Sequence, residues 1–305
     1  MLGILMSGMI VSCSKNDDNN DEGVIDANNR NSNIAFGKSE AMRLEVPALR
    51  RGSGIYFVTR RAAIDNRPGV GKTINYCIEY DSTYYHSRWV AFCFDDTTRQ
   101  RNVSRSDVPY QTDPFLPARC RLQENGFYGS GYDHGHLCAS ADRLFSTEAN
   151  EQTFYMTNMS PQIHNFNGGY WVTLEGLVRD WSLASKNKRL YVCKGGTIRT
   201  DQQLRTTNAY NALGKQVKVA VPKYYFMAIL AETHNQTFQS IGFLLEHKDY
   251  GYNYNSIAPK ELMKQHAVSI DELEEFTGID FFCNLNDALE NAVEKNYSLS
   301  AWSWR

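Results

Sequence analysis

The chain has 305 residues, of which 42% are hydrophobic and 12% aromatic, and this composition excludes a wholly disordered protein. Its length suffices for one large domain or two small ones. The formal net charge is −2. Residues 14–40 hold six acidic and three basic side chains, so residues 41–305 carry a net charge of +1. A near-neutral body disfavours a tight electrostatic binder of duplex nucleic acid, but it leaves open an enzyme that must release its product.

The first 13 residues predict an exported lipoprotein. Residues 1–12 are apolar or small, too short a run to span a bilayer, and Ile10-Val11-Ser12-Cys13 resembles a bacterial lipobox. We expect residues 1–13 to be a signal peptide with a lipidated Cys13, residues 14–40 a flexible acidic tether and residues 41–305 the folded domain. The lipid would anchor the protein at the outer membrane or cell surface of a Gram-negative bacterium. No Lys or Arg precedes the apolar run, and a short hydrophobic tail before a chance cysteine is the alternative.

Six further cysteines leave the pattern of disulfides open. They are Cys77, Cys93, Cys120, Cys138, Cys193 and Cys283. In an exported chain, six cysteines allow up to three disulfides and fifteen complete pairings. Three of them (77, 93 and 193) lie within strand-like runs, where a buried free thiol is an equally ordinary outcome.

Seven runs rich in β-branched and aromatic residues predict strands. They cover residues 55–59, 74–80, 89–94, 190–193, 217–221, 225–231 and 241–245. Helices are predicted between these runs, so the chain is expected to form an α+β domain with a mostly antiparallel sheet and inserted helices. No internal repeat divides it further.

Two helices are indicated by local signals. Trp171, Leu174, Leu177, Val178 and Trp181 recur at helical spacing and form one apolar stripe that would face the core. The two glycines before this stripe, residues 168 and 169, are expected to allow a tight turn into the helix. Near the C-terminus, the sequence Ser-Ile-Asp-Glu at 269–272 is a capping box, and the short helix it begins would end at the glycine at 278.

Two polar segments carry the candidate chemistry. The first is Tyr132-Asp133-His134-Gly135-His136-Leu137-Cys138, and the second is Asn158-Met159-Ser160-Pro161-Gln162 followed by Asn167 and Glu175. Hydrolysis of a phosphodiester needs an activated water, neutralisation of the phosphoryl oxygens and help for the leaving 3′-oxygen. His136 suits the first task, because an unperturbed imidazole with a pKa of about 6.5 is largely neutral, and therefore basic, near pH 7.

A divalent metal ion suits the other two tasks. Mg²⁺ usually takes only one or two protein ligands and keeps several waters, so a site with few carboxylates is chemically reasonable. Asn167 could ligate the ion through its amide oxygen. Glu175 lies eight residues further along the predicted helix, about 12 Å away at ~1.5 Å per residue, and more plausibly holds a metal-bound water. Asn158 and Gln162 would orient the base, the waters or the loop.

This set of residues resembles the DNA/RNA non-specific endonuclease family of the ββα-metal (His-Me finger) type. The family's Asp-Arg-Gly-His motif matches residues 133–136, its Asn-x-x-Pro-Gln run matches residues 158–162, and its Asn…Trp…Glu helix matches Asn167, Trp171 and Glu175. The likeness extends over about residues 75–282. It implies that His136 is the general base, that Asn167 holds a single Mg²⁺ or Mn²⁺, and that Glu175, Asn158 and Gln162 support them.

Two arginine positions of the family are altered or ambiguous here. His134 stands where the family usually has arginine, and an imidazole cannot fully replace a permanent charge on a planar fork. The resemblance therefore implies lower activity, or activity that depends on pH if His134 must be protonated beside Asp133. A second arginine is expected upstream to clamp the phosphate, and we favour Arg105 for this role, with Arg101 as the alternative.

The function implied by the resemblance is a metal-dependent, sugar-non-specific endonuclease that hydrolyses DNA and RNA to products ending in 5′-phosphate. The alternative is a degenerate nuclease-fold surface module that binds nucleic acid or protein without cleavage. A disulfide-rich adhesion module indifferent to chelators is a third reading.

Simpler interpretations exist for the individual residues. His134, His136 and Cys138 alternate, so on one strand they would share a face and could bind zinc with His164 as a fourth ligand. The two residues at 158 and 162 could bond their own loop, Asn167 could only cap a helix, and the glutamate at 175 could only complement the helix dipole.

Overall fold

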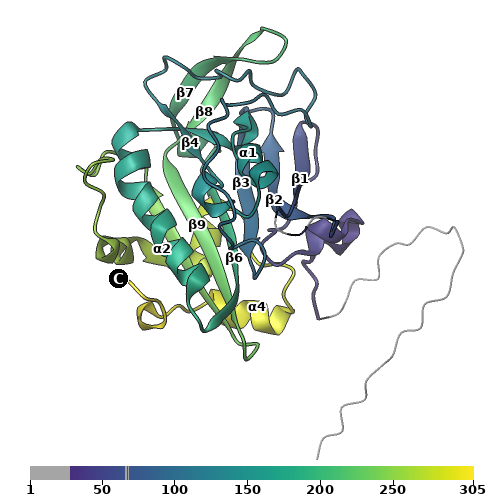
Figure 1. Cartoon of the computed structure of the whole chain (residues 1–305), viewed down its shortest axis with the longest axis vertical. Helices are drawn as coiled ribbons and strands as arrows, with labels where there is room; N and C mark the ends of the chain where they lie inside the picture. Colours follow the sequence, from purple (N-terminus) through teal and green to yellow (C-terminus); the bar gives the residue numbers. More distant parts are fainter. Residues whose placement is uncertain (1–27, 66, 68) are drawn as a thin grey trace, which may run out of the picture.

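The structure is a computed structural model that describes residues 28–65, 67 and 69–305; the predicted lipidation site, Cys13, lies outside the described residues. Its centre is a seven-stranded sheet in the order β1-β2-β3-β6-β9-β10-β11, in which every neighbouring pair is antiparallel (Figure 1). The strands are β1 (Ile55–Ala63), β2 (Lys72–Asp81), β3 (His86–Phe94), β6 (Asn187–Gly196), β9 (Tyr224–Thr233), β10 (Phe238–Glu246) and β11 (Ala267–Val268). Six of the seven predicted strands lie in this sheet.

Alternating side chains of the sheet pack into two separate hydrophobic cores. Ile78 and Phe92 point to the face covered by α2 (Val172–Leu183), which crosses in front of β6 and β9 in Figure 1. Cys77 and Ala91 point to the opposite face, which is covered by α3 (Ile270–Thr277) and α4 (Asp287–Glu294). Both faces of these strands are therefore buried, which explains why they read as nearly continuous apolar runs.

A ββα unit lies on the α2 side of the sheet. Strand β4 (Asp133–His136) pairs antiparallel with β5 (Met159–Gln162), and a π-helical turn, Phe166–Trp171, then leads directly into α2. The helix α1 (Thr147–Gln152), capped by the Ser146 side chain, lies between the two strands along the chain. The remaining predicted strand, 217–221, lies in β8 (Gln216–Pro222), which pairs only with β7 (Gln203–Tyr210) in a hairpin at the top of Figure 1.

The glycine pair before α2 has a different role from the predicted tight turn. Gly168 and Gly169 lie inside the π-helical turn, where a loop from later in the chain touches them. A Cβ on Gly168 would lie 2.2 Å from the ring of Tyr254, and one on Gly169 would lie 2.2 Å from the backbone of Tyr252. The glycines are therefore required for close packing between this loop and the helix.

The C-terminal third follows the predicted caps. Ser269 and Glu272 form the capping box of α3, which ends at Gly278 in the left-handed conformation, as predicted. The last residues also pack on the body, because Trp302 and Trp304 place their rings 4.6 and 5.4 Å from that of Trp181 on α2. Among the described helices, none is both long and apolar enough to cross a bilayer.

The folded body begins earlier than the predicted boundary at residue 41. Residues 28–40, expected to be part of the tether, include the short 3₁₀ helix Asn33–Phe36 and pack against the end of the chain. The side chain of Asn33 is buried and donates to the carbonyls of Ala41 and Pro47, and Arg30 pairs with Asp287. These polar contacts fix the segment, and they cannot be read from its acidic composition.

All six cysteines outside the predicted signal peptide are buried and free. Because none of them forms a disulfide, packing and not cross-linking holds the described part of the chain together. The fold class is α+β with a mostly antiparallel sheet and inserted helices, as predicted.

Candidate active site

One cavity of about 190 Å³ brings together the residues predicted to carry the chemistry. His134 and His136 reach it from β4, Asn167 from the π-helical turn and Glu175 from the first turn of α2, while Arg105 comes from the long loop after β3. These residues are far apart in the sequence, and the ββα unit places them around a single space. Asp133 lies at the edge of an adjoining, more open groove that also includes His134 and Asn167.

Asp133 orients the amide of Asn167. The Asn167 Nδ2 donates to Asp133 Oδ2 at 2.9 Å and to the hydroxyl of Tyr254 at 2.7 Å. A carboxylate can only accept, so the nitrogen of the amide must face Asp133 and its oxygen must face away. Asp133 also accepts from Tyr254 at 3.3 Å and lies 3.1 Å from His164 Nδ1. The amide oxygen of Asn167 is left available to a cation.

Glu175 belongs to a buried network of charges that sequence reasoning missed. It accepts a hydrogen bond from Lys194 Nζ at 2.9 Å, and the same ammonium lies 3.6 Å from Asp142. Asp142 in turn accepts from Arg179 at 2.8 Å. The network alternates in sign, so each buried charge has an opposite neighbour. The ammonium and guanidinium hold the pKa of Asp142 below its usual range, although burial opposes this shift.

His136 is held as a neutral imidazole with a free nitrogen. Burial, helped by the positive charges of Arg105 and Lys194, lowers its pKa to about 3. Its Nε2 is buried, and no described residue is hydrogen-bonded to it. The ring meets Phe154 edge to face, with 5.2 Å between the ring centroids. A neutral ring with an unused nitrogen, next to the other site residues, has the properties of a proton acceptor.

His134 does not act as a charged substitute for arginine in this structure. Its ring is stacked between those of Tyr110 and Phe127, at centroid distances of 4.4 and 4.2 Å. Burial in this sandwich lowers the pKa of His134 to about 4, although Asp133 favours the charged form. The ring is therefore neutral near pH 7. The minor zinc interpretation also fails, because Cys138 turns into the α2-side core and, within the described residues, these side chains form no metal-binding group.

Asn158 and Gln162 lie beneath the site and do not line the cavity. Asn158 is fully buried and accepts from the Cys138 backbone nitrogen, while its own nitrogen donates to the carbonyls of Cys138 and Thr153. It therefore fixes the loop that follows His136. The residue at 162 packs so closely on Gly135 that a Cβ there would lie 2.0 Å from its amide oxygen. Of the predicted options, the geometry favours a role in holding the loop and strand.

Arg105 is an exposed cation at the edge of the cavity. Its guanidinium lies 5.3 Å above the ring of Phe154, and no salt bridge to a described residue engages it. Arg101 does not line this cavity. Arg105 is therefore the better placed of the two candidates for contact with a phosphate.

The donor set of the cavity suits a hard divalent cation. Asn167 offers an amide oxygen, and Glu175 offers a carboxylate on the same wall of the cavity. Amide and carboxylate oxygens with room for several waters are the environment that Mg²⁺ and Mn²⁺ prefer. No cysteine lines the cavity among the described residues, so it offers no thiolate to a softer metal.

Three residues near the site, Arg179, Lys194 and Tyr254, were not predicted from the sequence. They differ in how clearly the sequence indicates them. Arg179 lies four positions after Glu175, so helix geometry alone places both on one face. Lys194 follows Leu190 and Val192 in alternation, so the strand pattern places its charge in line with core-facing side chains, which is a usable signal of a buried partner. Tyr254 lies in a loop with no pattern and could not have been found.

Comparisons with known proteins agree with this geometry. A family model described as DNA/RNA non-specific endonuclease matches residues 60–288. A nuclease from a Nostoc species is 31% identical over 224 residues, which are 72% of this chain and 75% of that protein. The mitochondrial nuclease EXOG of Xenopus laevis is 28% identical over 219 residues, which are 70% of this chain but 58% of that protein, so the chain spans less than two thirds of it.

A solved structure shares the fold. The crystal structure of the EndoG/EndoGI complex, which concerns EndoG inhibition, matches with a TM-score of 0.57 and 23% identity, covering 70% of this chain and 85% of the other. The ββα-metal architecture, the match of the family model over most of the chain and the cavity with His136, Asn167 and Glu175 point to the same group. The chain belongs to the DNA/RNA non-specific endonuclease family.

Proposed function

We propose that this chain is a Mg²⁺- or Mn²⁺-dependent, sugar-non-specific endonuclease that hydrolyses phosphodiester bonds of DNA and RNA and leaves 5′-phosphates. The observation that carries this proposal is the cavity in which the unpaired Nε2 of His136, the oriented amide of Asn167 and the free guanidinium of Arg105 meet. A base, a cation-binding oxygen and a phosphate-binding charge are the groups that this reaction needs.

His136 performs the proton transfer in the proposed reaction. Its neutral ring takes a proton from water, and the water oxygen attacks phosphorus on the side opposite the 3′-oxygen. The bond from phosphorus to the 3′-oxygen breaks, the 3′-oxygen takes a proton from solvent water, and the phosphate stays on the 5′-oxygen of the next nucleotide. Because a bound phosphodiester is negative, it raises the pKa of His136 above its value of about 3 in the free protein and stabilises the proton once it is taken.

Charge neutralisation is divided between Arg105 and the cation site. Arg105 donates to a non-bridging oxygen of the phosphate, and its permanent charge offsets the negative charge that develops there. A divalent cation held by Asn167, with Glu175 ordering its water, supplies further positive charge to the phosphate when bound. Lys194 keeps Glu175 in place from below, and Asp133 with Tyr254 keeps the Asn167 amide turned correctly.

The groove next to the cavity suits a polynucleotide strand with little sequence preference. It is an open depression of about 640 Å³ lined by four tyrosine rings, together with the imidazoles of His134 and His164. The four tyrosines are Tyr110, Tyr128, Tyr132 and Tyr254. Rings stack on any base, so they support binding without selecting a sequence, and the phosphates face the positive residues of the cavity.

Digestion of supercoiled plasmid and of total RNA tests the proposal. With Mg²⁺ or Mn²⁺, the purified chain is expected to cut both, and EDTA is expected to abolish cutting. His136→Ala should lower the rate at least about 100-fold, as expected for loss of a general base. His234→Ala is the matched control, because this histidine is exposed and far from the cavity lining. A folded wild-type protein that binds a labelled oligonucleotide but cuts neither substrate would instead favour the non-cleaving binding module.

We further propose that Cys13 carries a lipid and that the nuclease acts at the outer membrane or cell surface of a Gram-negative cell. The lipobox-like sequence before this cysteine and the export-type N-terminus support the proposal. Expressed in a Gram-negative host, the wild-type chain should fractionate with membranes and incorporate labelled fatty acid, while Cys13→Ala should do neither. Equal partitioning of both proteins would contradict an anchor at this residue.

A further inference from the structure

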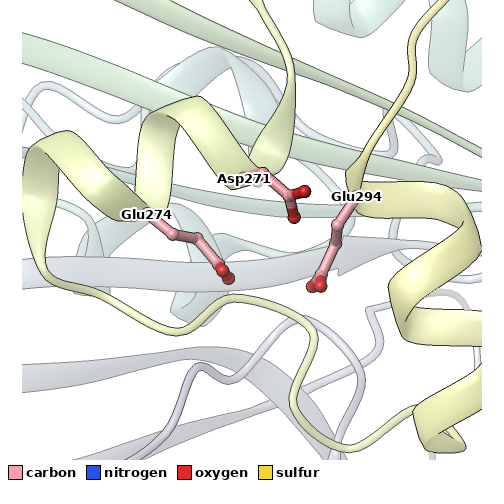
Figure 2. A group of neighbouring side chains, drawn as sticks. All are labelled: Asp271, Glu274 and Glu294. Atoms are coloured by element: carbon pink, nitrogen blue, oxygen red, sulfur yellow. The ribbon is translucent and has the colours of Figure 1, made fainter.

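A group of carboxylates lies between α3 and α4, on the face of the sheet opposite the active site. Figure 2 shows Asp271 and Glu274 projecting from α3 toward Glu294 at the end of α4. One oxygen from each of the three carboxylates lies within 4.8 Å of one oxygen from each of the others. Asp271 is exposed, so the group is open to solvent on one side.

Glu294 is the member that packing alone does not explain. The residue is only 6% exposed, and its Oε1 is buried without a hydrogen-bond partner among the described residues. No salt bridge from a described Lys or Arg reaches any of the three carboxylates. Glu274 has one oxygen occupied, since it accepts from the Phe281 backbone at 2.6 Å, and its other oxygen is free for a ligand.

Among the described residues, the surroundings add negative charge, and no Lys or Arg forms a salt bridge with the group. Glu290 and Asp280 lie close by, and both accept from the side chain of Asn31. Burial together with these neighbouring carboxylates raises the pKa of Glu294 to about 10 and that of Glu274 to about 8. A buried carboxylate in such a field must take up either a proton or a cation.

We propose that Asp271, Glu274 and Glu294 bind one Ca²⁺ between α3 and α4, at a site separate from the ion of the proposed nuclease reaction. Ca²⁺ takes carboxylate oxygens at 2.3–2.6 Å, so ligand atoms on opposite sides of the ion are up to about 5 Å apart. The 4.8 Å limit falls within this span. Three protein carboxylates also suit Ca²⁺ better than Mg²⁺, which is usually bound through one or two carboxylates and keeps several waters. Water completes the coordination on the open side.

The ion would join two helices that otherwise meet through apolar contacts. Ile270 and Leu273 of α3 and Val293 of α4 belong to the same hydrophobic core on this face of the sheet. A cation that bridges the helices binds the folded state and not the unfolded chain, so it stabilises the fold by mass action. The site is therefore structural, and its occupancy is read from stability and direct binding, with no need for an activity assay.

Calcium binding by the full chain tests the proposal in an Asn167→Ala background, which removes the proposed active-site ligand. Isothermal titration should give one Ca²⁺ per chain after treatment with EDTA, and Ca²⁺ at about 100 times its Kd should raise the Tm by roughly 5 °C. Glu294→Gln should abolish both effects. Glu275→Gln, the matched control on α3, changes the same charge on an exposed side chain and should keep both.

The outcomes distinguish carboxylates that bind Ca²⁺ from carboxylates that only share a proton. Binding of Ca²⁺ that Glu294→Gln leaves intact would overturn the proposal, and so would a Tm that Ca²⁺ does not raise. If Glu294→Gln does not fold, Asp271→Asn replaces it, because Asp271 is exposed and its loss removes a ligand without disturbing the core. Since none of these measurements uses nucleic acid, the result stands apart from the proposed nuclease activity.

Discussion

Under α2, the buried carboxylates of Glu175 and Asp142 share the ammonium of Lys194, and Arg179 completes the alternation of charges. Across the sheet, the carboxylates between α3 and α4 face one another with no cationic side chain among the described residues (Figure 2). Asp142 and Glu294 are similarly buried, at 3% and 6% exposure. The pKa is lowered for Asp142 and raised for Glu294, so the neighbours and not the depth decide the charge.

This difference separates two uses of buried carboxylates. The charges on the α2 side are fixed by the protein itself, which suits a site that must present one electrostatic arrangement to each substrate. The charge of the carboxylates between α3 and α4 depends on the protons and cations that they take up from the solution. The following changes test this contrast, from the largest expected effect to the smallest.

Replacing Lys194 removes the cation that Glu175 and Asp142 share under α2. Lys194→Met leaves Glu175 and Asp142 buried without their shared cation, so the free energy of unfolding in urea should fall by about 3–5 kcal/mol, with loss of nuclease activity. Lys188→Met is the control on the same strand, since its ammonium pairs with Glu232 at the surface, and it should cost less than about 1 kcal/mol. Equal stability of the two variants would mean that the buried charges are not coupled.

The dependence of stability on pH should have opposite signs on the two faces. His86 and His247, which hold β5 on the α2 side, are buried, and burial lowers the pKa of each to about 4. In the unfolded chain the pKa of each histidine is about 6.5, so between pH 4 and pH 6.5 the unfolded chain binds more protons than the folded protein. The free energy of unfolding is therefore highest above pH 6.5 and falls toward pH 4. Each histidine contributes up to about 3 kcal/mol. A raised carboxylate pKa, as at Glu294, has the opposite effect and makes the free energy of unfolding fall as the pH rises.

Urea unfolding from pH 4 to pH 8 in EDTA measures these contributions. The wild-type protein should lose stability steeply below pH 6.5, and His86→Gln should flatten the profile over that range. His234→Ala should keep the wild-type slope, because this side chain is exposed in the folded protein. An acid limb of the same slope in His86→Gln and in the wild-type protein would contradict a neutral His86 in the folded state.

A substitution at Asn158 tests whether the α2 side of the sheet also depends on uncharged hydrogen bonds. Asn158→Ala leaves the Cys138 amide nitrogen buried without its acceptor, and two carbonyls lose their donor. The expected loss is about 2–3 kcal/mol in thermal or urea unfolding. Because the side chain does not line the cavity, the metal dependence of any remaining activity should stay as in the wild type. A change in metal affinity larger than the change in stability would reveal a direct role.

Tyr254 gives the smallest expected effect. Tyr254→Phe removes one hydroxyl that accepts from Asn167 and donates to Asp133, but keeps the ring. The concentration of Mg²⁺ needed for half-maximal cutting should rise about 3- to 10-fold, corresponding to about one lost hydrogen bond, with kcat nearly unchanged. Tyr128→Phe, in the same groove but without a contact to Asn167, should leave it unchanged. An equal shift in both variants would place the effect in substrate binding.

Local patterns predicted much of this molecule. The seven predicted strands, the helix from its apolar stripe and the capped helix at 269 are all present, because each depends on residues near in sequence, whereas β4, β5, β7 and β11 were not predicted. The grouping of His136, Asn167, Glu175 and Arg105 around one cavity agrees with what the family resemblance implied. The role of these residues in catalysis remains a prediction.

The features that escaped prediction depend on distant contacts. Nothing near His134 indicates that Tyr110 and Phe127 will enclose its ring and keep it neutral. Strand β4 was not predicted, because four polar and glycine residues carry no strand signal until β5 pairs with them. Residues 28–40 have the composition of a tether, and their bonds to residues some 250 positions later, which help to fix them, cannot be read from composition. Composition could not separate buried thiols from disulfides either.

The contact between the π-helical turn and the loop at Tyr252 and Tyr254 has a consequence for variation within the family. Gly168 and Gly169 directly follow Asn167, the proposed metal ligand, and any side chain on them would push the loop outward, and with it the hydroxyl that contacts Asn167. The two segments, about 85 residues apart, must therefore change together. Grafting this loop onto another nuclease would require the glycine pair to be transferred with it, and a library that randomises one segment alone would return mostly inactive proteins.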